Sequence, residues 1–282
     1  MKKITRRSFM AAAGLTVAAL ALTACGGSSS TASSAAASSV ASSAAASSEA
    51  ASAAATELTT VEAGKLTMAT NAAFPPYEMT TDAGEFEGID IETAQAIADK
   101  LGLELQIDDM DFDAALLSVQ QGKADIVMAG VTVTDERKAV MDFSDNYATG
   151  IQSIIVPEGS DIASPDDLAG KMIGTQRGTT GYIYCSDDFG DENVVAYDDG
   201  LTAVQALNNG QVDAVVIDNA PAKEFVAANP GLVILDTSYA EEDYAIGMAK
   251  GSSLEDAVNA ALEELKADGT LQSIVDKYIT AE

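Results

Sequence analysis

Short apolar runs alternate along the chain with longer segments in which an apolar residue recurs every three or four positions. Short runs are typical of buried strands, and the second spacing is typical of helices with one buried face. We expect strands at residues 65–70, 103–107, 124–129, 171–175 and 212–217, and helices at 89–101, 113–121, 202–208, 254–266 and 271–278. The alternation predicts an α/β fold whose largely parallel sheets are covered by helices.

One local pattern occurs twice. In residues 120–127 and again in 208–216 a glycine ends a helix, and an aspartate, Asp125 or Asp213, begins an apolar strand. We interpret both aspartates as structural and the repetition as a sign of two similarly built lobes. Chain crossings between the lobes are expected at 154–156 and 244–248. The predicted limits are 61–155 with 246–282 for the first lobe and 156–245 for the second.

The loops after the strands form the candidate binding site. In folds of this class, ligands bind beyond the carboxyl ends of the strands. The loops concerned carry Asn71, Gly130, Gln176 and Asp218. Asp218 has a second interpretation as the cap of the helix after its strand, and the two roles are compatible.

Arg137 is the candidate anion-binding residue. The pattern predicts Thr134 as the N-cap of a short helix whose first turn holds Asp135, Glu136 and Arg137. A helix N-terminus and a guanidinium would together bind a small anion such as a carboxylate. A lone arginine more often pairs with a surface aspartate. We favour the anion site because Arg137 and Arg177 are the only arginines beyond residue 24, and Arg177 suits a solvated loop.

The first 60 residues predict export and anchoring. Basic residues at 2, 3, 6 and 7 precede the apolar stretch 9–22, which is too short to span a membrane. This pattern predicts a secretory signal peptide at residues 1–24. Leu22-Thr-Ala-Cys25 matches a bacterial lipobox, in which Cys25 is lipidated. The adjacent Arg6 and Arg7 also fit a twin-arginine export signal. Residues 25–60, rich in Ser and Ala, predict a disordered tether.

Charge and composition exclude several functions. Of 15 basic residues four lie in the leader, so 11 basic residues oppose 44 acidic ones beyond it, a net charge of −33. Such a surface repels nucleic acid and anionic lipid. The chain has no histidine, which removes His-based catalysis and the usual zinc sites. Cys185 is the single cysteine after Cys25, so no disulfide is expected within the mature chain.

Six motifs in this order resemble the polar amino-acid-binding proteins of ABC importers, which are bacterial extracellular solute-binding proteins. They are Phe74-Pro-Pro-Tyr-Glu, Gly88-Ile-Asp-Ile-Glu, Met110-Asp-Phe-Asp, Ala129-Gly-Val-Thr-Val-Thr-Asp-Glu-Arg, Asp142-Phe-Ser-Asp and Gly178-Thr-Thr-Gly. The similarity runs from about Lys65 to the C-terminus. It implies a two-lobed periplasmic-binding-protein-like fold (type II), with two hinge crossings, that closes over its ligand.

The resemblance also implies partners and location. We expect a monomer that delivers a polar amino acid to the transmembrane subunits of an ABC permease, works outside the cytoplasm and contacts the membrane through its lipid anchor only. No cofactor, metal or catalytic residue is expected.

The family's binding residues can be placed on this sequence. Arg137, with the backbone N–H groups of Thr132 and Thr180, would hold the ligand carboxylate. Asp218, the Gly130 carbonyl and the Thr132 hydroxyl would hold the ammonium group. The rings that would flank the ligand side chain are those of Phe74 and Phe112.

At the selectivity positions the sequence differs from its relatives. Asn71 stands where many members carry an acid, and Gln176 and Ile217 stand where glutamine-binding members carry basic residues. Glu78 could still supply a negative charge. We therefore expect a polar, near-neutral pocket for the side chain.

Two functions of other classes stay open at this point. A dehydratase acting on a prephenate-like acid would need an acid group in the pocket, and Glu78 could be that group. It would have little use for an ammonium-binding Asp218 paired with Arg137. A surface adhesin with a relic pocket is the second alternative, and the intact set of Arg137, Thr132 and Asp218 argues against a lost binding function.

Overall fold

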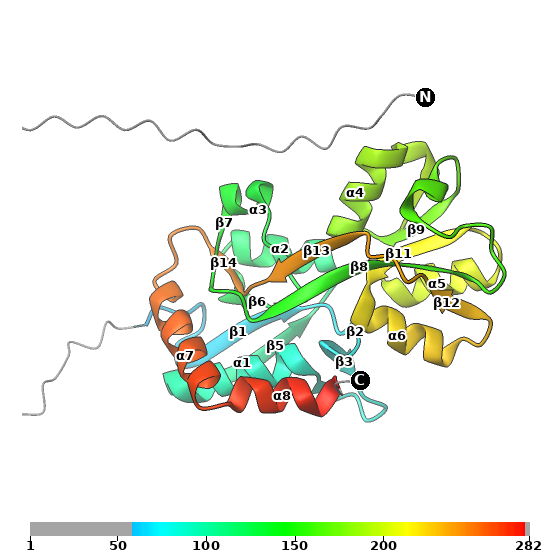
Figure 1. The fold of residues 1–282 in the computed structure, drawn as a ribbon. Coiled ribbons are helices and arrows are strands. Elements are labelled where there is room, and N and C mark those ends of the chain that lie inside the picture. The colour runs from blue at the N-terminus through cyan, green and yellow to red at the C-terminus, as the bar shows by residue number, and fades with distance from the viewer. Residues whose placement is uncertain (1–57, 280–282) are drawn as a thin grey trace, which may run out of the picture. The chain divides into compact units, whose positions relative to one another are not determined.

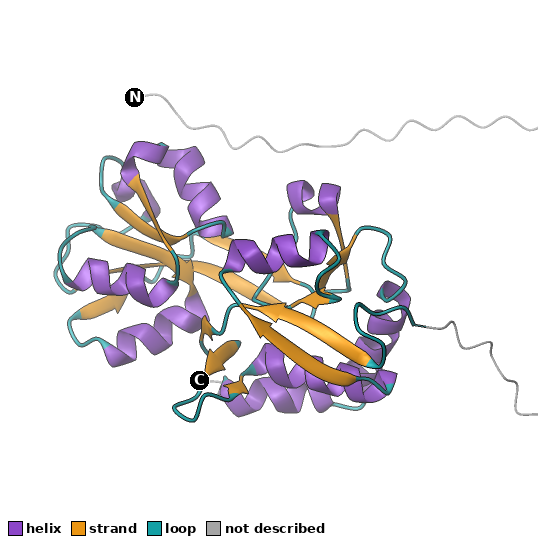
Figure 2. Ribbon diagram, turned by 180° about the vertical axis from the view of Figure 1, so that it is seen from behind, coloured by secondary structure: helices purple, strands orange, loops and turns teal. Residues whose placement is uncertain are grey.

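The computed structural model describes residues 58–279, and the predicted signal peptide, Cys25 and nearly all of the predicted tether lie outside this part. Among the described residues, none of the helices has both the length and the apolar character needed to cross a bilayer. Two large sheets are present, and each has helices on both faces (Figures 1 and 2). We call the sheets with their covering helices the first and second lobe.

The first lobe is built on a five-stranded sheet with the order β5-β1-β6-β14-β7. Its strands are β1 (Lys65–Thr70), β5 (Glu104–Asp109), β6 (Ile126–Val127), β7 (Met141–Phe143) and β14 (Gly247–Ala249). β1 pairs in parallel with β5 and β6, and β14 runs antiparallel to β6 and β7. The small sheet β2-β3-β4, which the sequence did not predict, is formed by β2 (Ala73–Phe74), β3 (Glu78–Thr80) and β4 (Phe86–Glu87).

Strand alternation divides the core of this lobe. Leu66 and Met68 of β1 pack with α1 (Ile89–Leu101), α7 (Glu255–Ala267) and α8 (Thr270–Tyr278) on one face. Ala69, on the opposite face, packs with α2 (Phe112–Gln120). Successive side chains of a strand point to opposite faces, so one strand supplies both cores.

The second lobe is built on a six-stranded sheet with the order β10-β9-β11-β8-β12, and β13 also pairs with β8. Its strands are β8 (Ala148–Pro157), β9 (Ile173–Gln176), β10 (Val194–Tyr197), β11 (Ala214–Asp218), β12 (Leu232–Ile234) and β13 (Ala240–Tyr244). Its helices are α4 (Thr180–Phe189), α5 (Gly200–Asn208) and α6 (Asn219–Ala228), with the short 3-10 turns η1 (Pro165–Leu168) and η2 (Asp191–Asn193).

Two strands carry the chain between the lobes. β8 pairs with β13 over residues 148–152 and with β11 and β12 over residues 152–157. The stretch from Ala148 to Ile151, and not the predicted 154–156, therefore connects the sheets (Figure 1). The predicted second crossing at 244–248 is two strands, β13 and β14, broken at Ala245 and Ile246 where the chain changes sheet. The predicted lobe limits at 155 and 245 stay a prediction.

Most predicted elements are confirmed, with small shifts at their ends. α1 ends at Gly102, which adopts the left-handed conformation expected of a glycine cap. Thr134 caps α3 (Asp135–Val140), because its hydroxyl accepts the backbone N–H of Arg137. The predicted strand 124–129 is shorter than expected, since only Ile126 and Val127 pair in the sheet.

Candidate functional site

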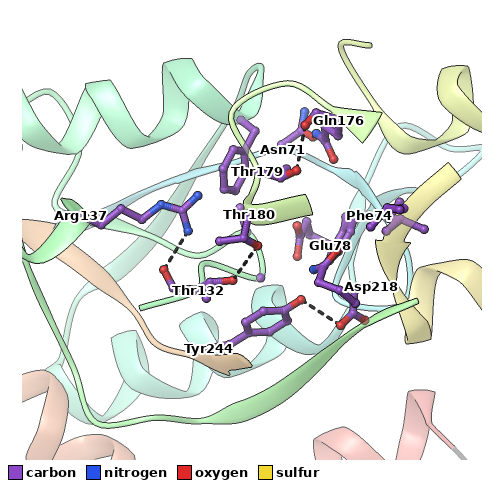
Figure 3. A pocket seen from close by; sticks show the side chains of 16 residues that line it. Asn71, Phe74, Glu78, Thr132, Arg137, Gln176, Thr179, Thr180, Asp218 and Tyr244 are labelled. Carbon is purple, nitrogen blue, oxygen red and sulfur yellow. Dashed lines mark hydrogen bonds between the residues drawn. The ribbon is translucent and has the colours of Figure 1, made fainter. Parts of the chain in front are cut away.

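A pocket lies between the two lobes, and all nine predicted ligand-binding residues line it (Figure 3). Its cavity of about 30 Å³ holds about two water molecules, so an amino acid can enter only when the lobes separate. The lining residues are Asn71, Phe74, Glu78, Phe112, Ala129, Gly130, Thr132, Arg137, Gln152, Gln176, Thr179, Thr180, Val216, Ile217, Asp218 and Tyr244.

Arg137 enters the pocket from α3 and is held in place by both lobes. Its Nη1 donates to the Thr132 carbonyl at 2.8 Å and its Nη2 to the Gly178 carbonyl, from the second lobe, at 3.1 Å. The guanidinium carbon lies 5.3 Å from the centre of the Phe112 ring. Two of the five N–H donors of an arginine are used in these bonds. Burial lowers the pKa of Arg137, and the charge of Glu242 counteracts this.

The N-terminus of α3 does not reach the pocket as we expected. The backbone N–H of Arg137 is engaged by the Thr134 cap, and residues 134–136 do not line the cavity. Arg137 is therefore the one residue of α3 that lines the pocket. α4 fills the expected place instead, because Thr180, its first residue, lines the pocket. Backbone N–H groups at a helix start have no partner within the helix and suit an anion.

Asp218 lies on the opposite side of the pocket from Arg137 (Figure 3). One carboxylate oxygen accepts the backbone N–H of Ile151 at 2.7 Å and the hydroxyl of Tyr244 at 3.0 Å. The other accepts the N–H of Ala220 at 2.9 Å, so Asp218 also caps α6, as the second interpretation required. Burial raises the pKa of Asp218 to about 6, against the lowering effect of these donors.

Thr132 lies between Arg137 and Asp218 in Figure 3, and Gly130 also lines the pocket. The Thr132 hydroxyl donates to Glu242 at 3.0 Å and lies 3.4 Å from the Thr180 hydroxyl of the other lobe. Because the Thr132 hydroxyl gives its proton to Glu242, its oxygen can still accept a hydrogen bond from a donor. The backbone N–H of Gly130 donates to Asp90 at 3.0 Å.

Asn71 and Gln176, at the expected selectivity positions, bind each other across the lobes. The side-chain amide of Gln176 donates to the Asn71 oxygen at 2.8 Å (Figure 3). Asn71 in turn donates to the Met110 carbonyl at 2.9 Å. Two neutral amides thus close one side of the pocket.

Phe74 and Phe112 both line the pocket but differ in their contacts. Phe74 is half-buried and stacks on Tyr77, with ring centres 5.8 Å apart. Phe112 is buried beneath the guanidinium of Arg137. Phe74 therefore has a ring face for a ligand side chain, and Phe112 also supports Arg137.

Glu78, whose direction the sequence left open, faces the pocket. Its side chain is fully buried, and neither carboxylate oxygen has a hydrogen-bond partner among the described residues. In Figure 3 it lies between Thr180, Phe74 and Asp218. Burial and the adjacent Asp90 raise the pKa of Glu78 well above its usual value. Two carboxyl groups and one guanidinium line the pocket, and the raised pKa of Glu78 favours its neutral form, so the expectation of a near-neutral pocket stays a prediction.

Sequence reasoning missed the residues of the crossing strands. Gln152 of β8 and Tyr244 of β13 line the pocket, and Glu242, two positions before Tyr244, accepts from both Thr132 and Gln152. Glu242 and Tyr244 are the buried residues of β13, but Ala240-Glu-Glu-Asp-Tyr244 has no apolar alternation that would have indicated this. The structural roles expected of Asp125, Asp213 and the exposed Arg177 are confirmed.

The family model of bacterial extracellular solute-binding proteins, family 3, matches residues 66–281. This chain belongs to that family. The L-cystine-binding protein TcyJ of Escherichia coli (strain K12) is 33% identical over 226 residues, which cover 78% of this chain and 85% of TcyJ. The arginine-binding extracellular protein ArtP of Bacillus subtilis (strain 168) is 33% identical over 228 residues, 77% of this chain and 87% of ArtP.

Solved structures agree in fold. The structure of an ancestral arginine-binding protein bound to arginine matches with a TM-score of 0.73 and 42% sequence identity. The match covers 77% of this chain and 98% of the ancestral protein. The structure of an ancestral arginine-binding protein bound to glutamine matches with a TM-score of 0.74 and 41% sequence identity. That match covers 78% of this chain and 100% of the ancestral protein.

The predicted family, the two-lobed α/β fold and the function as a solute-binding protein are confirmed. The family's members are transport proteins and not enzymes, and neither the dehydratase nor the adhesin alternative finds support among these relatives.

Proposed function

We propose that this protein captures a basic amino acid, with arginine as the first candidate, and delivers it to an ABC permease. The charge balance of the pocket carries the proposal. One guanidinium, Arg137, opposes two lining carboxyl groups, Glu78 and Asp218. A zwitterion neutralises one positive and one negative group, so the second acid, once ionised, has a partner only if the ligand carries a second positive charge.

The backbone of the ligand has a binding partner for each end. Its carboxylate binds the free N–H groups of Arg137 and the N-terminus of α4 at Thr180. Its ammonium group binds Asp218, the Gly130 carbonyl and the Thr132 hydroxyl. Because these groups come from both lobes, the ligand stabilises the closed form.

The side chain of the ligand lies against Phe74 and Ile217, under the Asn71–Gln176 amide pair, with its positive group at Glu78. Burial of an unpaired carboxylate is costly, and a guanidinium or ammonium group removes that cost. The arginine named for ArtP and for the ancestral protein supports this assignment.

Glutamine is the second candidate. The amides of Asn71 and Gln176 match a neutral amide side chain, and the raised pKa of Glu78 favours a protonated acid that can donate to it. The ancestral protein that was also solved with glutamine supports this ranking.

Isothermal titration calorimetry against arginine, lysine, glutamine and cystine tests the proposal. We expect the tightest binding for arginine at neutral pH. Tighter binding of glutamine or cystine would refute the preference for a basic ligand, and no binding of any free amino acid would refute the function itself.

We further propose that the protein is an extracytoplasmic, monomeric lipoprotein. Residues 1–24 are removed, Cys25 carries the lipid, and residues 26–60 connect it to the folded part. A flexible chain of this length reaches roughly 30 Å on average, which keeps the binding lobes near a membrane-embedded permease.

A further inference from the structure

Glu78 and Asp90 form a buried pair of carboxyl groups on the first lobe. Both side chains are fully buried. Glu78 is on β3 and lines the pocket, whereas Asp90 is in the first turn of α1, behind it. The charged groups that act on Glu78 are the carboxylates of Asp90, Asp109 and Asp218. Of the four carboxylate oxygens of the pair, three have no donor: both of Glu78 and Oδ1 of Asp90.

The two acids are not equivalent. Oδ2 of Asp90 accepts the Tyr147 hydroxyl at 2.8 Å and the Gly130 backbone N–H at 3.0 Å. These two donors favour the ionised form of Asp90. Glu78 has no such donor, so a single proton held by the pair belongs on Glu78 and Asp90 stays ionised.

Burial and the neighbouring acids both raise the pKa of Glu78. Burial is the main reason that its pKa is raised, and burial also raises the pKa of Asp90 to about 6. Arg137, the basic residue that lines the pocket, already donates to two backbone carbonyls and lies near Glu242. The other titratable groups around the pair are Tyr77, Asp109, Tyr147 and Asp218.

We propose that Glu78 and Asp90 share one proton, and that the positively charged side chain of a basic amino acid displaces this proton when it binds. The O–H bond of Glu78 breaks, the proton passes to solvent, and the carboxylate that remains pairs with the ligand cation. A ligand with a neutral side chain leaves the proton in place and receives a hydrogen bond from it. The pair thus makes the choice between basic and neutral ligands depend on pH.

This inference rests on the proposed function and can be tested separately from it. Arginine and citrulline have nearly the same shape, and only arginine carries a positive side chain. Both place an ammonium group at Asp218, so any proton exchanged there cancels in the difference between the two ligands.

The experiment is calorimetry of the purified protein with each ligand in buffers of different ionisation enthalpy, between about pH 6 and pH 8, which gives the number of protons released. We expect arginine to release up to one proton more than citrulline, with the difference falling as pH rises. The affinity for arginine relative to citrulline should rise by up to about tenfold per pH unit. Equal proton release at every pH would overturn the shared proton while leaving amino-acid binding intact.

Variants sharpen the result. Glu78→Gln should remove the difference in proton release and favour citrulline over arginine. Glu87→Gln, an exposed acid on the neighbouring strand β4, is the matched control and should behave as the wild type. A difference that persists in Glu78→Gln would also overturn the proposal. The wild-type titrations decide the matter without any variant if Glu78→Gln does not fold.

If neither arginine nor citrulline binds, arginine fails as the ligand of the proposed function, and the role of the pair in binding it fails as well.

Discussion

At the scale of single residues, the two arginines beyond residue 24 have opposite roles. Arg137 is 8% exposed and held by carbonyls of both lobes, whereas the side chain of Arg177 is 55% exposed and lies 3.6 Å from Asp198. A buried guanidinium between polar partners is positioned to bind a carboxylate. An exposed ion pair contributes little to stability.

Arg137→Ala should abolish high-affinity binding, because the ligand carboxylate would lose its charged partner. Loss of one partner from a buried charge pair costs at least about 2 kcal/mol, and we therefore expect affinity to fall by about 30-fold or more. Calorimetry measures this, and circular dichroism checks the fold. Arg177→Ala is the control and should bind as the wild type. Unchanged affinity in Arg137→Ala would refute the site.

At the scale of elements, Gly178 of the second lobe packs closely against α2 of the first lobe. Gly178, between β9 and α4, has a positive φ of 73°, and a Cβ built there would lie 1.6 Å from an Asp113 oxygen of α2. Gly178 therefore serves closure as well as the backbone turn, since its missing side chain lets the second lobe approach α2.

Gly178→Ala should weaken ligand binding by obstructing closure while each lobe stays folded. Gly159→Ala is the matched control, because Gly159 has a similar φ of 80° and no atom within 4 Å of an added Cβ. Small-angle scattering with saturating ligand should show incomplete compaction for Gly178→Ala only. Removing the obstacle in the double variant with Asp113→Ala should restore affinity. Equal losses in both glycine variants would indicate backbone strain instead.

Local signals account for what the sequence predicted correctly. The Thr134 cap, the Gly102 end of α1 and the strand 65–70 depend on neighbours within a few positions. The missed features depend on pairing between distant segments. Gln152 and Glu242 meet only because β8 and β13 pair, and the break at Ala245 follows from the change of sheet. The motif resemblance placed all nine site residues in one pocket, but their mutual contacts needed the fold.

At the scale of the whole molecule, negative charge opposes folding. The chain beyond residue 24 has a net charge of −33, and the pKa values of Glu78, Asp90 and Asp218 are raised in the folded state. An acid with a raised pKa stabilises the fold at low pH, below its unfolded value, and this contribution is lost as pH rises through its folded pKa. Self-repulsion of the net charge acts in the same direction.

The melting temperature of the ligand-free protein should therefore fall as pH rises from about 4 to about 7. Glu78→Gln should flatten this dependence, since the glutamine cannot ionise. Basic ligand should raise the melting temperature more at the higher pH, because it binds the ionised form. Differential scanning calorimetry over this range measures both effects. A wild-type melting temperature that rises steadily toward pH 7 would contradict the assignment of raised pKa values.

The attachment of the molecule is the last property that the sequence predicts, and it rests on Cys25. Because a thioether-linked lipid at this residue is the proposed anchor, Cys25→Ser should release the protein from the membrane fraction without loss of amino-acid affinity. Cell fractionation followed by calorimetry on the released protein measures both. Cys185→Ser is the control, since Cys185 is buried in the second lobe and should leave attachment unchanged. Continued membrane association of Cys25→Ser would place the anchor elsewhere, for example in an uncleaved leader.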